Sequence, residues 1–575
     1  MNHKIVLKDA YKRYTHDQDK LFSPEETVRR FKERLKKVDL DILEGTVRID
    51  NERLGIPVFF SLCGKDAVDV IGTKKQMGKG GTPQQSEASA VMELAERFSF
   101  FSFWKNSDNF FIEEYRNLKG RALPFESIAL SVHDNSGDLN AAREIFSTLP
   151  LKWTRAYNLT RQEELLIPFD WFYTINEFNG PSAGNCAEEA LIQGICEVIE
   201  RHVSSIISHK RLKTDAIDII SVNDPLSIEM IRKYDKEGIR LFLTDFSLDT
   251  GIPSVGALAY DPSTFPEKSE IVWTAGTTPC PQKALSRALT EVAQLAGDFN
   301  SGSNYVASGL PKFSSLEEAD FVINSDNMID INHLPDLSNE NIKVEVENCV
   351  SALSKTGMEV IVVNTMHPML QIPAFYTIIP GAHFRERAIG TSVGMFSAKL
   401  IAENKNPEWA ISQLKKMDEL MPEKYYTRFF LGICHLSMND PANALRYLEE
   451  ALAFEPKEED IPSIYSYMAQ SLKELQKYRE ALAVLEKAEK YDNERTDIYN
   501  LMGFCRFKLG EHDEAIKCFK NVIRLDPTSA IDYANIASNY RDMGNKEQAI
   551  RYYRLALELD PTIDFARDNL SELLF

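Results

Sequence analysis

The sequence predicts two parts, a mixed α/β domain over residues 1–403 and an all-α array of helix pairs over residues 404–575. Upstream, runs of β-branched and aromatic residues alternate with helical patterns, and downstream a motif repeats about every 34 residues. The length of 575 residues exceeds what one hydrophobic core usually holds. Hydrophobic residues make up 43% of the chain and charged residues 26%, as in ordinary globular proteins.

The bulk properties narrow the class of protein. The formal net charge of −20 argues against a general nucleic-acid binder, because such proteins carry a basic surface. The eight cysteines show no C-x-x-C spacing, which indicates reduced thiols. No stretch approaches the ~20 apolar residues that span a bilayer, and the first residues lack an apolar signal core. We therefore expect a cytoplasmic protein that binds neither membranes nor nucleic acid.

The α/β part is predicted from its strand and helix patterns. Strand candidates rich in β-branched and aromatic residues, each ending at turn formers, are 56–64, 239–247, 253–261, 270–276, 359–365 and 374–381. Helices are expected at 24–38, 84–104, 186–209, 281–297 and 340–355. Ser23 is placed to cap the first of these helices, with Pro24 as its first residue and Glu26 as the acid of a capping box.

The C-terminal third is predicted from its repeats. Alanines recur 37, 34 and 34 residues apart, at Ala444, Ala481, Ala515 and Ala549. Prolines close successive units at Pro456, Pro527 and Pro561. A helix–turn–helix period of 34 residues is typical of tetratricopeptide (TPR) repeats. We expect a half-repeat, about four repeats and a capping helix, whose concave surface would bind a peptide or a partner protein.

Two short stretches carry the same E-x-x-E-R pattern inside apolar runs. They are ELAER at residues 93–97 and EVIER at residues 197–201. A helix places positions i and i+3 on one face, so each box aims two carboxylates in the same direction. Buried carboxylates need a partner, and Mg²⁺ shares oxygen ligands with phosphates. The boxes therefore favour a magnesium–nucleotide site over the plainer interpretation of solvated helix faces.

The turn at residues 182–186 precedes the second box. Ser182 and Asn185 are placed either to cap the following helix or to leave backbone amides free for a phosphate, and the sequence leaves both alternatives open. Glu189 and Gln193 lie one and two turns before Glu197, so they share its helix face. These residues would extend the site beyond the boxes.

Other charged residues are less informative by themselves. Arg287 and Glu291 stand at i and i+4 of a helix, which reads most simply as a surface ion pair. Lys20, Thr27 and Arg30 bring cations and a hydroxyl group to a strongly basic N-terminal helix, which alone indicates a solvated helix.

Four segments together resemble the YcaO family: 78–99, 179–203, 273–294 and 367–381. The resemblance covers roughly residues 20–400 and implies a mixed α/β fold that binds ATP and Mg²⁺ without a P-loop. Residues 72–82 indeed fail the P-loop spacing. The family's activity would then be implied: ATP-dependent phosphorylation of a peptide-backbone amide oxygen, after a nucleophile has added to the carbonyl carbon.

The resemblance also implies site residues by position. The magnesium ligands would be Glu93, Glu96, Glu197 and Glu200. The nucleotide contacts would be Lys20, Thr27, Arg30, Ser182, Asn185, Glu189, Gln193, Arg201, Arg287 and Glu291. Of these, we expect Arg201, Arg287 and Glu291 to be catalytic, with the arginines neutralising charge on the transferred phosphoryl group. A homodimer is also implied, since dimers are common in the family.

The C-terminal part separates this sequence from the azoline-forming members. Those members end in a proline-rich tail, whereas this sequence ends in Glu-Leu-Leu-Phe after TPR repeats. A YcaO domain followed by TPR repeats is similar to members linked to β-methylthiolation of a ribosomal protein, and thioamidation of a peptide is a related expectation. The alternative is an ATP-binding adaptor that acts through its TPR repeats.

Overall fold

A computed structural model describes residues 4–72, 75–118, 120–176, 178–300, 310–384 and 391–574. The chain divides into two compact units. The α/β unit comprises Met1–Ser136 and Ser147–Val393, and the helical unit comprises Gly137–Phe146 and Gly394–Phe575. The boundary expected between residues 403 and 404 stays a prediction. Within the ranges described, no helix combines the length and the apolar character needed to cross a membrane.

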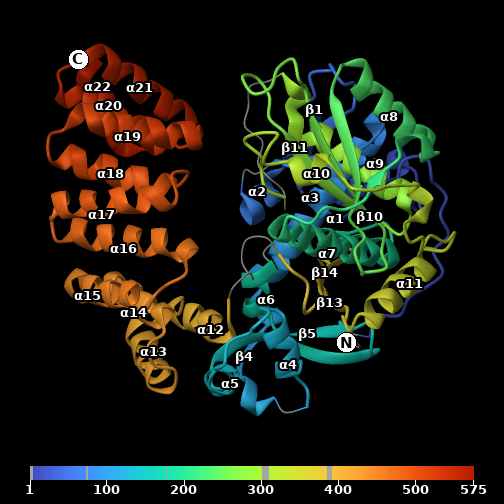
Figure 1. Ribbon diagram of the computed structural model, residues 1–575, viewed down its shortest axis with the longest axis horizontal. Coiled ribbons are helices and arrows are strands. Elements are labelled where there is room, and N and C mark those ends of the chain that lie inside the picture. Colours follow the sequence, from blue (N-terminus) through green and yellow to red (C-terminus); the bar gives the residue numbers. More distant parts are fainter. Residues whose placement is uncertain are drawn as a thin grey trace. The chain divides into compact units, whose positions relative to one another are not determined.

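The described strands of the α/β unit form three sheets (Figure 1). The first has the order β1 (Leu43–Arg48), β2 (Val58–Cys63) and β3 (Gln76–Lys79). The second has the order β11 (Val272–Thr277), β10 (Ser254–Tyr260), β9 (Arg240–Asp245), β8 (Ala216–Ile217) and β12 (Met328–Ile329). The third has the order β4 (Phe111–Glu114), β5 (Pro150–Asn158), β13 (Ile361–Asn364), β14 (Ala374–Ile378) and β7 (Pro181–Ala183), with β6 (Glu163–Pro168) paired to β5.

The predicted helices are confirmed to within a few residues. They are α1 (Pro24–Val38), α3 (Pro83–Lys105), α7 (Ala187–Lys210), α9 (Pro281–Ala296) and α11 (Ile342–Lys355). The other helices of the chain before residue 391 are α2 (Lys65–Ile71), α4 (Phe125–Leu130), α5 (Leu139–Ser147), α6 (Phe169–Asn176), α8 (Pro225–Lys236) and α10 (Asp320–Ile323). The six strand candidates are confirmed as β2, β9, β10, β11, β13 and β14.

Helix α1 begins as the sequence predicts, with one correction. The Ser23 hydroxyl accepts a hydrogen bond from the Glu26 amide at 3.3 Å, which satisfies one free donor of the first turn. The Glu26 carboxylate, however, accepts hydrogen bonds from the Arg29 guanidinium rather than closing a capping box. A nearby guanidinium competes well for this carboxylate because both groups are charged.

The two E-x-x-E-R boxes lie on buried helices. Helix α3 packs against β2, β3 and α1, while α7 packs against β7, β11 and β14. Apolar side chains anchor both helices: Val91, Leu94 and Phe98 of α3 and Leu191, Ile195, Val198 and Ile199 of α7 are almost wholly buried. Such burial is expected for a helix whose apolar residues are spread around all of its faces rather than gathered in one stripe. The side chains of Glu96, Glu197 and Glu200 are 14%, 14% and 1% exposed, whereas that of Glu93 is 34% exposed.

Two glycines allow site helices to cross strands closely. A Cβ atom at Gly78 of β3 would overlap the backbone of Ser86 and Ala90 in α3. A Cβ atom at Gly276 of β11 would overlap the backbone of Ala284 and Ala288 in α9. Backbone atoms cannot turn aside as a flexible side chain can, so these contacts set the depth of α3 and α9.

We expect the Gly78→Ala substitution to destabilise the protein by about 1–3 kcal/mol, the usual cost of overpacking a core. Urea unfolding of the purified protein measures this free energy. The matched control is Gly45→Ala in the same sheet, where no atom lies within 4 Å of the added Cβ. Equal stability of the two variants would show that α3 can shift away from β3.

The helical unit confirms the TPR solenoid (Figure 1). Its C-terminal segment begins with α12 (Val393–Ala402) and α13 (Pro407–Leu420). Four helix pairs follow: α14 (Tyr425–Ser437) with α15 (Pro441–Ala453), α16 (Ile461–Glu474) with α17 (Tyr478–Tyr491), α18 (Thr496–Lys508) with α19 (His512–Leu525), and α20 (Ala530–Asp542) with α21 (Lys546–Leu559). Helix α22 (Asp564–Leu574) packs on α21 at the end. The periodic alanines are fully buried where paired helices touch, which explains their spacing.

Candidate functional site

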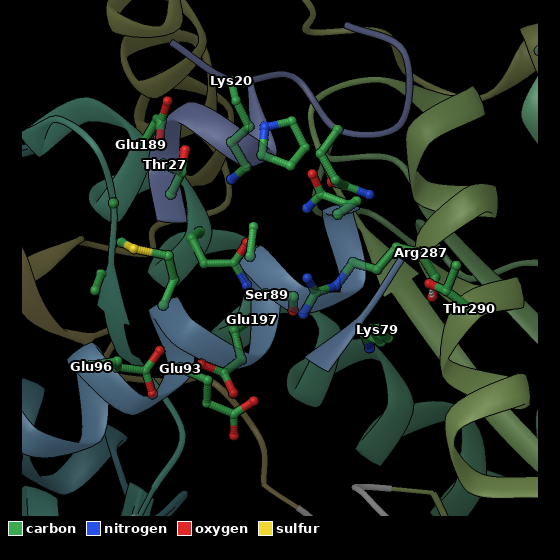
Figure 2. Close-up of a pocket in the computed structure, with 18 of the residues that line it drawn as sticks. Lys20, Thr27, Lys79, Ser89, Glu93, Glu96, Glu189, Glu197, Arg287 and Thr290 are labelled. Atoms are coloured by element: carbon green, nitrogen blue, oxygen red, sulfur yellow. Dashed lines mark hydrogen bonds between the residues drawn. The ribbon is translucent and has the colours of Figure 1, made fainter. Parts of the chain in front are cut away.

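A cavity of about 310 Å³ is lined by residues of α1, α3, α7 and α9, of strand β3 and of the segment before α1. We call it the nucleotide cavity. Figure 2 shows that Glu93, Glu96 and Glu197 gather at one end, while Lys20, Thr27 and Glu189 lie at the other. Two boxes that lie about a hundred residues apart in the sequence therefore meet in one place.

Most of the expected site residues line this cavity. They are Lys20, Thr27, Glu93, Glu96, Asn185, Glu189, Gln193, Glu197, Arg201, Arg287 and Glu291. Three others lie elsewhere. Arg30 lines a neighbouring cavity, Ser182 is fully buried beside Gly194, and Glu200 lies behind the wall. The roles of all these residues stay predictions.

The carboxylates at the acidic end repel one another in the absence of a cation. Burial raises the pKa of Glu93, Glu96 and Glu197, and the charge of Glu197 raises the pKa of the other two further. Arg97 lies 3.8 Å from Glu93 and 3.5 Å from Glu96, beyond good hydrogen-bond distance. Among the residues that the structure describes, no three acidic, histidine or cysteine side chains meet closely enough to hold a metal ion, so magnesium binding by these carboxylates stays a prediction.

Glu200 belongs to a different environment. It is 1% exposed, and its Oε2 accepts hydrogen bonds from Arg287 Nε at 2.9 Å and from the Thr277 amide at 3.2 Å. Its Oε1 lies 3.7 Å from an Arg201 nitrogen and has no hydrogen-bond partner among the described residues. One buried carboxylate thus lies between two guanidiniums at the cavity wall.

Lys79 is a cavity residue that the sequence interpretation missed. It projects from β3 and forms an ion pair with Glu291 of α9. Burial lowers the pKa of the Lys79 ammonium. Burial would raise the pKa of Glu291, but the charges of Lys79, Arg201 and Arg287 outweigh it and hold that pKa at about 2. The segment at 78–82 already contributed to the family resemblance, so this lysine was visible as a candidate.

The interpretation of Arg287 and Glu291 as a surface ion pair is wrong. Glu291 is only 5% exposed, and Arg287 Nε donates its hydrogen bond to the buried carboxylate of Glu200. Both residues instead line the nucleotide cavity inside the α/β unit. The i, i+4 spacing alone could not reveal which face of α9 is buried.

At the opposite end, Glu189 connects two segments. Its Oε2 accepts hydrogen bonds from the Asn185 amide and side chain at 2.9 and 3.0 Å, and its Oε1 accepts one from the Leu21 amide at 2.5 Å. The prediction that Ser182 or Asn185 caps α7 is wrong, because Cys186 is the N-cap residue and makes no side-chain capping bond. Glu189 instead reaches back and holds the turn.

Magnesium binding should weaken as the pH falls. Because the pKa values of Glu93, Glu96 and Glu197 are raised, these groups hold protons at mildly acidic pH that a metal ion must displace. The affinity should therefore rise with pH and level off once all three are ionised. Calorimetric titration of Mg²⁺ into the protein with a non-hydrolysable ATP analogue, at mildly acidic and at neutral pH, measures it. An affinity that does not change with pH would contradict the raised pKa values.

Comparison with known families identifies both parts of the chain. The family described as YcaO cyclodehydratase, ATP- and Mg²⁺-binding, matches residues 77–383, more than half of the chain. A tetratricopeptide repeat family matches residues 494–562, and the family of subunit 3 of the anaphase-promoting complex (cyclosome) matches residues 439–522. The expected cofactors ATP and Mg²⁺ are confirmed by the description of the first family.

Two relatives match over different lengths. An uncharacterized protein of Methanothermobacter thermautotrophicus is 27% identical over 378 residues, which cover 62% of this chain and 93% of that protein. The ribosomal protein S12 methylthiotransferase accessory factor YcaO of Escherichia coli is 27% identical over 245 residues, which cover 38% of this chain and 40% of that protein.

Two solved structures share the fold. A heterocyclase in complex with substrate and cofactor has a TM-score of 0.55 and 22% identity, covering 66% of this chain and 54% of that chain. YcaO of Methanopyrus kandleri, bound with AMPPCP and Mg²⁺, has a TM-score of 0.50 and 22% identity, covering 65% of this chain and 95% of that chain. Together with the family match, they support ATP-dependent peptide modification in general. The chain belongs to the YcaO family, and its YcaO domain is followed by tetratricopeptide repeats.

Proposed function

We propose that this protein is an ATP- and magnesium-dependent enzyme that activates a peptide-backbone amide by phosphorylating its oxygen. The observation that carries the proposal is that one cavity brings residues of both E-x-x-E-R boxes together with two further cations; its lining includes Glu93, Glu96, Glu197, Arg201, Lys79 and Arg287. The heterocyclase solved with substrate and cofactor, and the relative bound with AMPPCP and Mg²⁺, support it. The finer form of the proposal is thioamidation of a peptide or a link to β-methylthiolation of a ribosomal protein. The similarity to the accessory factor of Escherichia coli supports the second of these.

Each group of side chains has its own part in this activity. Glu93, Glu96 and Glu197 would hold magnesium, with Glu200 as a fourth ligand, and bound magnesium would neutralise the phosphates of ATP. Arg201 and Arg287 would stabilise charge on the transferred phosphoryl group. Glu200 fixes both guanidiniums before any ligand arrives, so little reorganisation is needed when the charge develops.

The bond changes are those of an activated carbonyl. A nucleophile adds to the amide carbon, and the electron pair of the C=O bond moves to oxygen. That oxygen attacks the γ-phosphorus, the bond to ADP breaks, and the phosphorylated oxygen later leaves as phosphate. The nucleophile is a Cys, Ser or Thr side chain of the substrate or an external sulfide or amine, and its proton passes to water. The residues at the cavity supply position and charge rather than a nucleophile of their own.

A protein-binding adaptor is the second candidate, and the TPR solenoid favours it. In that case ATP would be a bound ligand or a switch, and the helical unit would recruit a partner. Such arrays bind partners on their concave surface and seldom carry out chemistry. The two candidates differ in whether ATP is consumed.

The test uses the purified full-length chain with Mg²⁺, ATP and candidate protein substrates. We expect release of ADP and phosphate that depends on substrate, together with a mass change in that substrate. Loss of one water would indicate cyclodehydration, and exchange of oxygen for sulfur would indicate thioamidation. ATP that binds but is never consumed with any partner would favour the adaptor and reject the enzyme.

A further inference from the structure

A second cavity of about 430 Å³ adjoins the nucleotide cavity. Helix α1 forms one side of it and the loop at residues 370–373 forms another. The two cavities have four lining residues in common: Thr27, Met92, Gly184 and Asn185. A chain lying in the second cavity could therefore pass over this shared wall into the first. We call the second cavity the basic cavity, for the side chains considered next.

The loop beside α1 is fixed at both ends. Arg34 donates hydrogen bonds from Nε to the Leu370 carbonyl at 2.9 Å and from a terminal nitrogen to the Met369 carbonyl at 2.6 Å. At the far end, the Pro373 carbonyl accepts a hydrogen bond from the Gly184 amide at 3.1 Å, where β7 and β14 pair. The basic cavity is thus a preformed part of the α/β unit, which favours binding at low entropic cost.

The charge of the basic cavity is strongly positive. Its lining includes four cations, Arg29, Arg30, Arg34 and Lys37, and one carboxylate, Glu33, an excess of three positive charges. The whole chain, by contrast, carries a net charge of −20. A local excess of this sign on an acidic protein attracts an anionic ligand and raises its rate of association.

Two of these cations, Arg29 and Lys37, are available to a new partner. Arg29 is paired with Glu26 and Glu33 at the exposed surface of α1, and such pairs contribute little to stability. Lys37 has no ion pair with any residue that the structure describes. Carboxylates of a ligand could therefore replace those of α1 at Arg29 and would be the first at Lys37.

Apolar groups beside the cations distinguish between kinds of anion. Ile372 and Pro373 line the cavity and are half-buried, so a ligand with apolar as well as acidic groups would fill it. Nucleic-acid bases usually stack on exposed aromatic rings. Phe31 is the one aromatic side chain in the described lining, and it is only 2% exposed. The lining therefore favours a peptide over a single-stranded nucleic acid.

We propose that the basic cavity binds an acidic segment of the polypeptide on which the enzyme acts. The role of the segment as substrate rests on the proposed function, because an enzyme that phosphorylates a peptide amide needs the polypeptide beside its nucleotide. The segment would anchor the polypeptide on α1 and lead it over Thr27 and Gly184 towards the nucleotide cavity. Recognition of substrate would then begin in the α/β unit rather than in the TPR repeats.

The first test measures binding of a fluorescein-labelled peptide rich in glutamate to the full-length chain. We expect Arg29→Glu/Lys37→Glu to weaken binding by about tenfold or more, since like charges brought together cost several kcal/mol. The matched control is Lys32→Glu/Lys36→Glu, which makes the same change of charge on the same helix at exposed residues outside both cavities. This control variant should bind the peptide nearly as well as the unchanged protein. A second control is a version of the peptide with glutamine in place of glutamate, which should bind the unchanged protein weakly.

Folding and location are checked separately. If the Arg29→Glu/Lys37→Glu variant melts at a lower temperature than the unchanged protein, the milder Arg29→Gln/Lys37→Gln variant is used in its place. A photo-crosslinking group on the same peptide should label α1 or residues 369–373. Equal loss of binding in the two charge-reversed variants, or labelling of the TPR helices, would overturn the proposal, as would tighter binding of a single-stranded oligonucleotide at the same residues.

The outcome can be separated from that of the proposed function. Binding of magnesium and a non-hydrolysable ATP analogue should be unchanged in the Arg29→Glu/Lys37→Glu variant, because neither residue lines the nucleotide cavity. Peptide binding is measured without turnover. A chain that binds the peptide in the basic cavity but never consumes ATP would count against the enzyme, whereas turnover that ignores the cavity variants would count against the docking site.

Discussion

We expect the Glu197→Gln variant to lose magnesium-dependent ATP turnover while its ligand-free form melts at a higher temperature than the unchanged protein. Glu197 lines the nucleotide cavity, and its side chain is only 14% exposed. Burial raises the pKa of this carboxyl group. A carboxyl group whose pKa is higher in the folded than in the unfolded protein destabilises the fold once it ionises, so its contribution worsens as the pH rises above the unfolded value. Glutamine has the same shape without the charge.

In the proposed function Glu197 is a magnesium ligand, so the same substitution should have the opposite effect on activity. Loss of a group that stabilises transferred charge typically lowers turnover by about 10²–10³-fold or more. Turnover assays and thermal melting of the same preparation measure the two effects. Glu347→Gln, a substitution at the exposed surface of α11, should change neither. A lower melting temperature in Glu197→Gln would mean that the carboxylate is satisfied in the ligand-free protein.

We expect the Glu200→Ala variant to behave in the opposite way and to lose about 3–5 kcal/mol of unfolding free energy, the usual cost of breaking a buried ion pair. The carboxylate of Glu200 is shared between Arg287 and Arg201, so its removal leaves two buried guanidiniums without this counter-charge. Denaturant unfolding measures the loss.

A double variant separates charge from packing. Adding Arg287→Met to Glu200→Ala removes one of the two guanidiniums and should restore part of the lost stability, because neighbouring substitutions are not additive. Stability of Glu200→Ala close to that of the unchanged protein would show that the arginines find other partners. The contrast between Glu197 and Glu200 is informative because both belong to one box on one helix.

The sequence predicted the helices of the site better than their contacts. The boxes of α3 and α7 stood out because apolar residues surround the glutamates in the sequence itself. The ion pair of Lys79 with Glu291 joins residues 212 positions apart, which no local pattern reveals. The same holds for the contact of Arg34 with Leu370, at a separation of 336, which closes the basic cavity.

Other features escaped prediction because they are short or because they depend on orientation. Strands β8 and β12 have two residues each and are held by their neighbours rather than by a pattern of their own. Residues 105–150 look polar, yet they contain β4 and the start of β5. Ser182 lies on β7, and the pairing with β14 turns its side chain towards the interior rather than the cavity. Sequence spacing shows which residues share one face of a helix, but it does not show towards which side a three-residue strand turns a given side chain.

The position of Glu200 couples the two ligands of the nucleotide cavity. Its Oε2 is engaged by Arg287, so a divalent ion that draws this carboxylate away would leave a guanidinium in need of an anion. A triphosphate supplies that anion and in turn relieves the competition for Glu200. Cation and triphosphate should therefore show heterotropic cooperativity, each raising the affinity for the other by the same factor, as reciprocity requires.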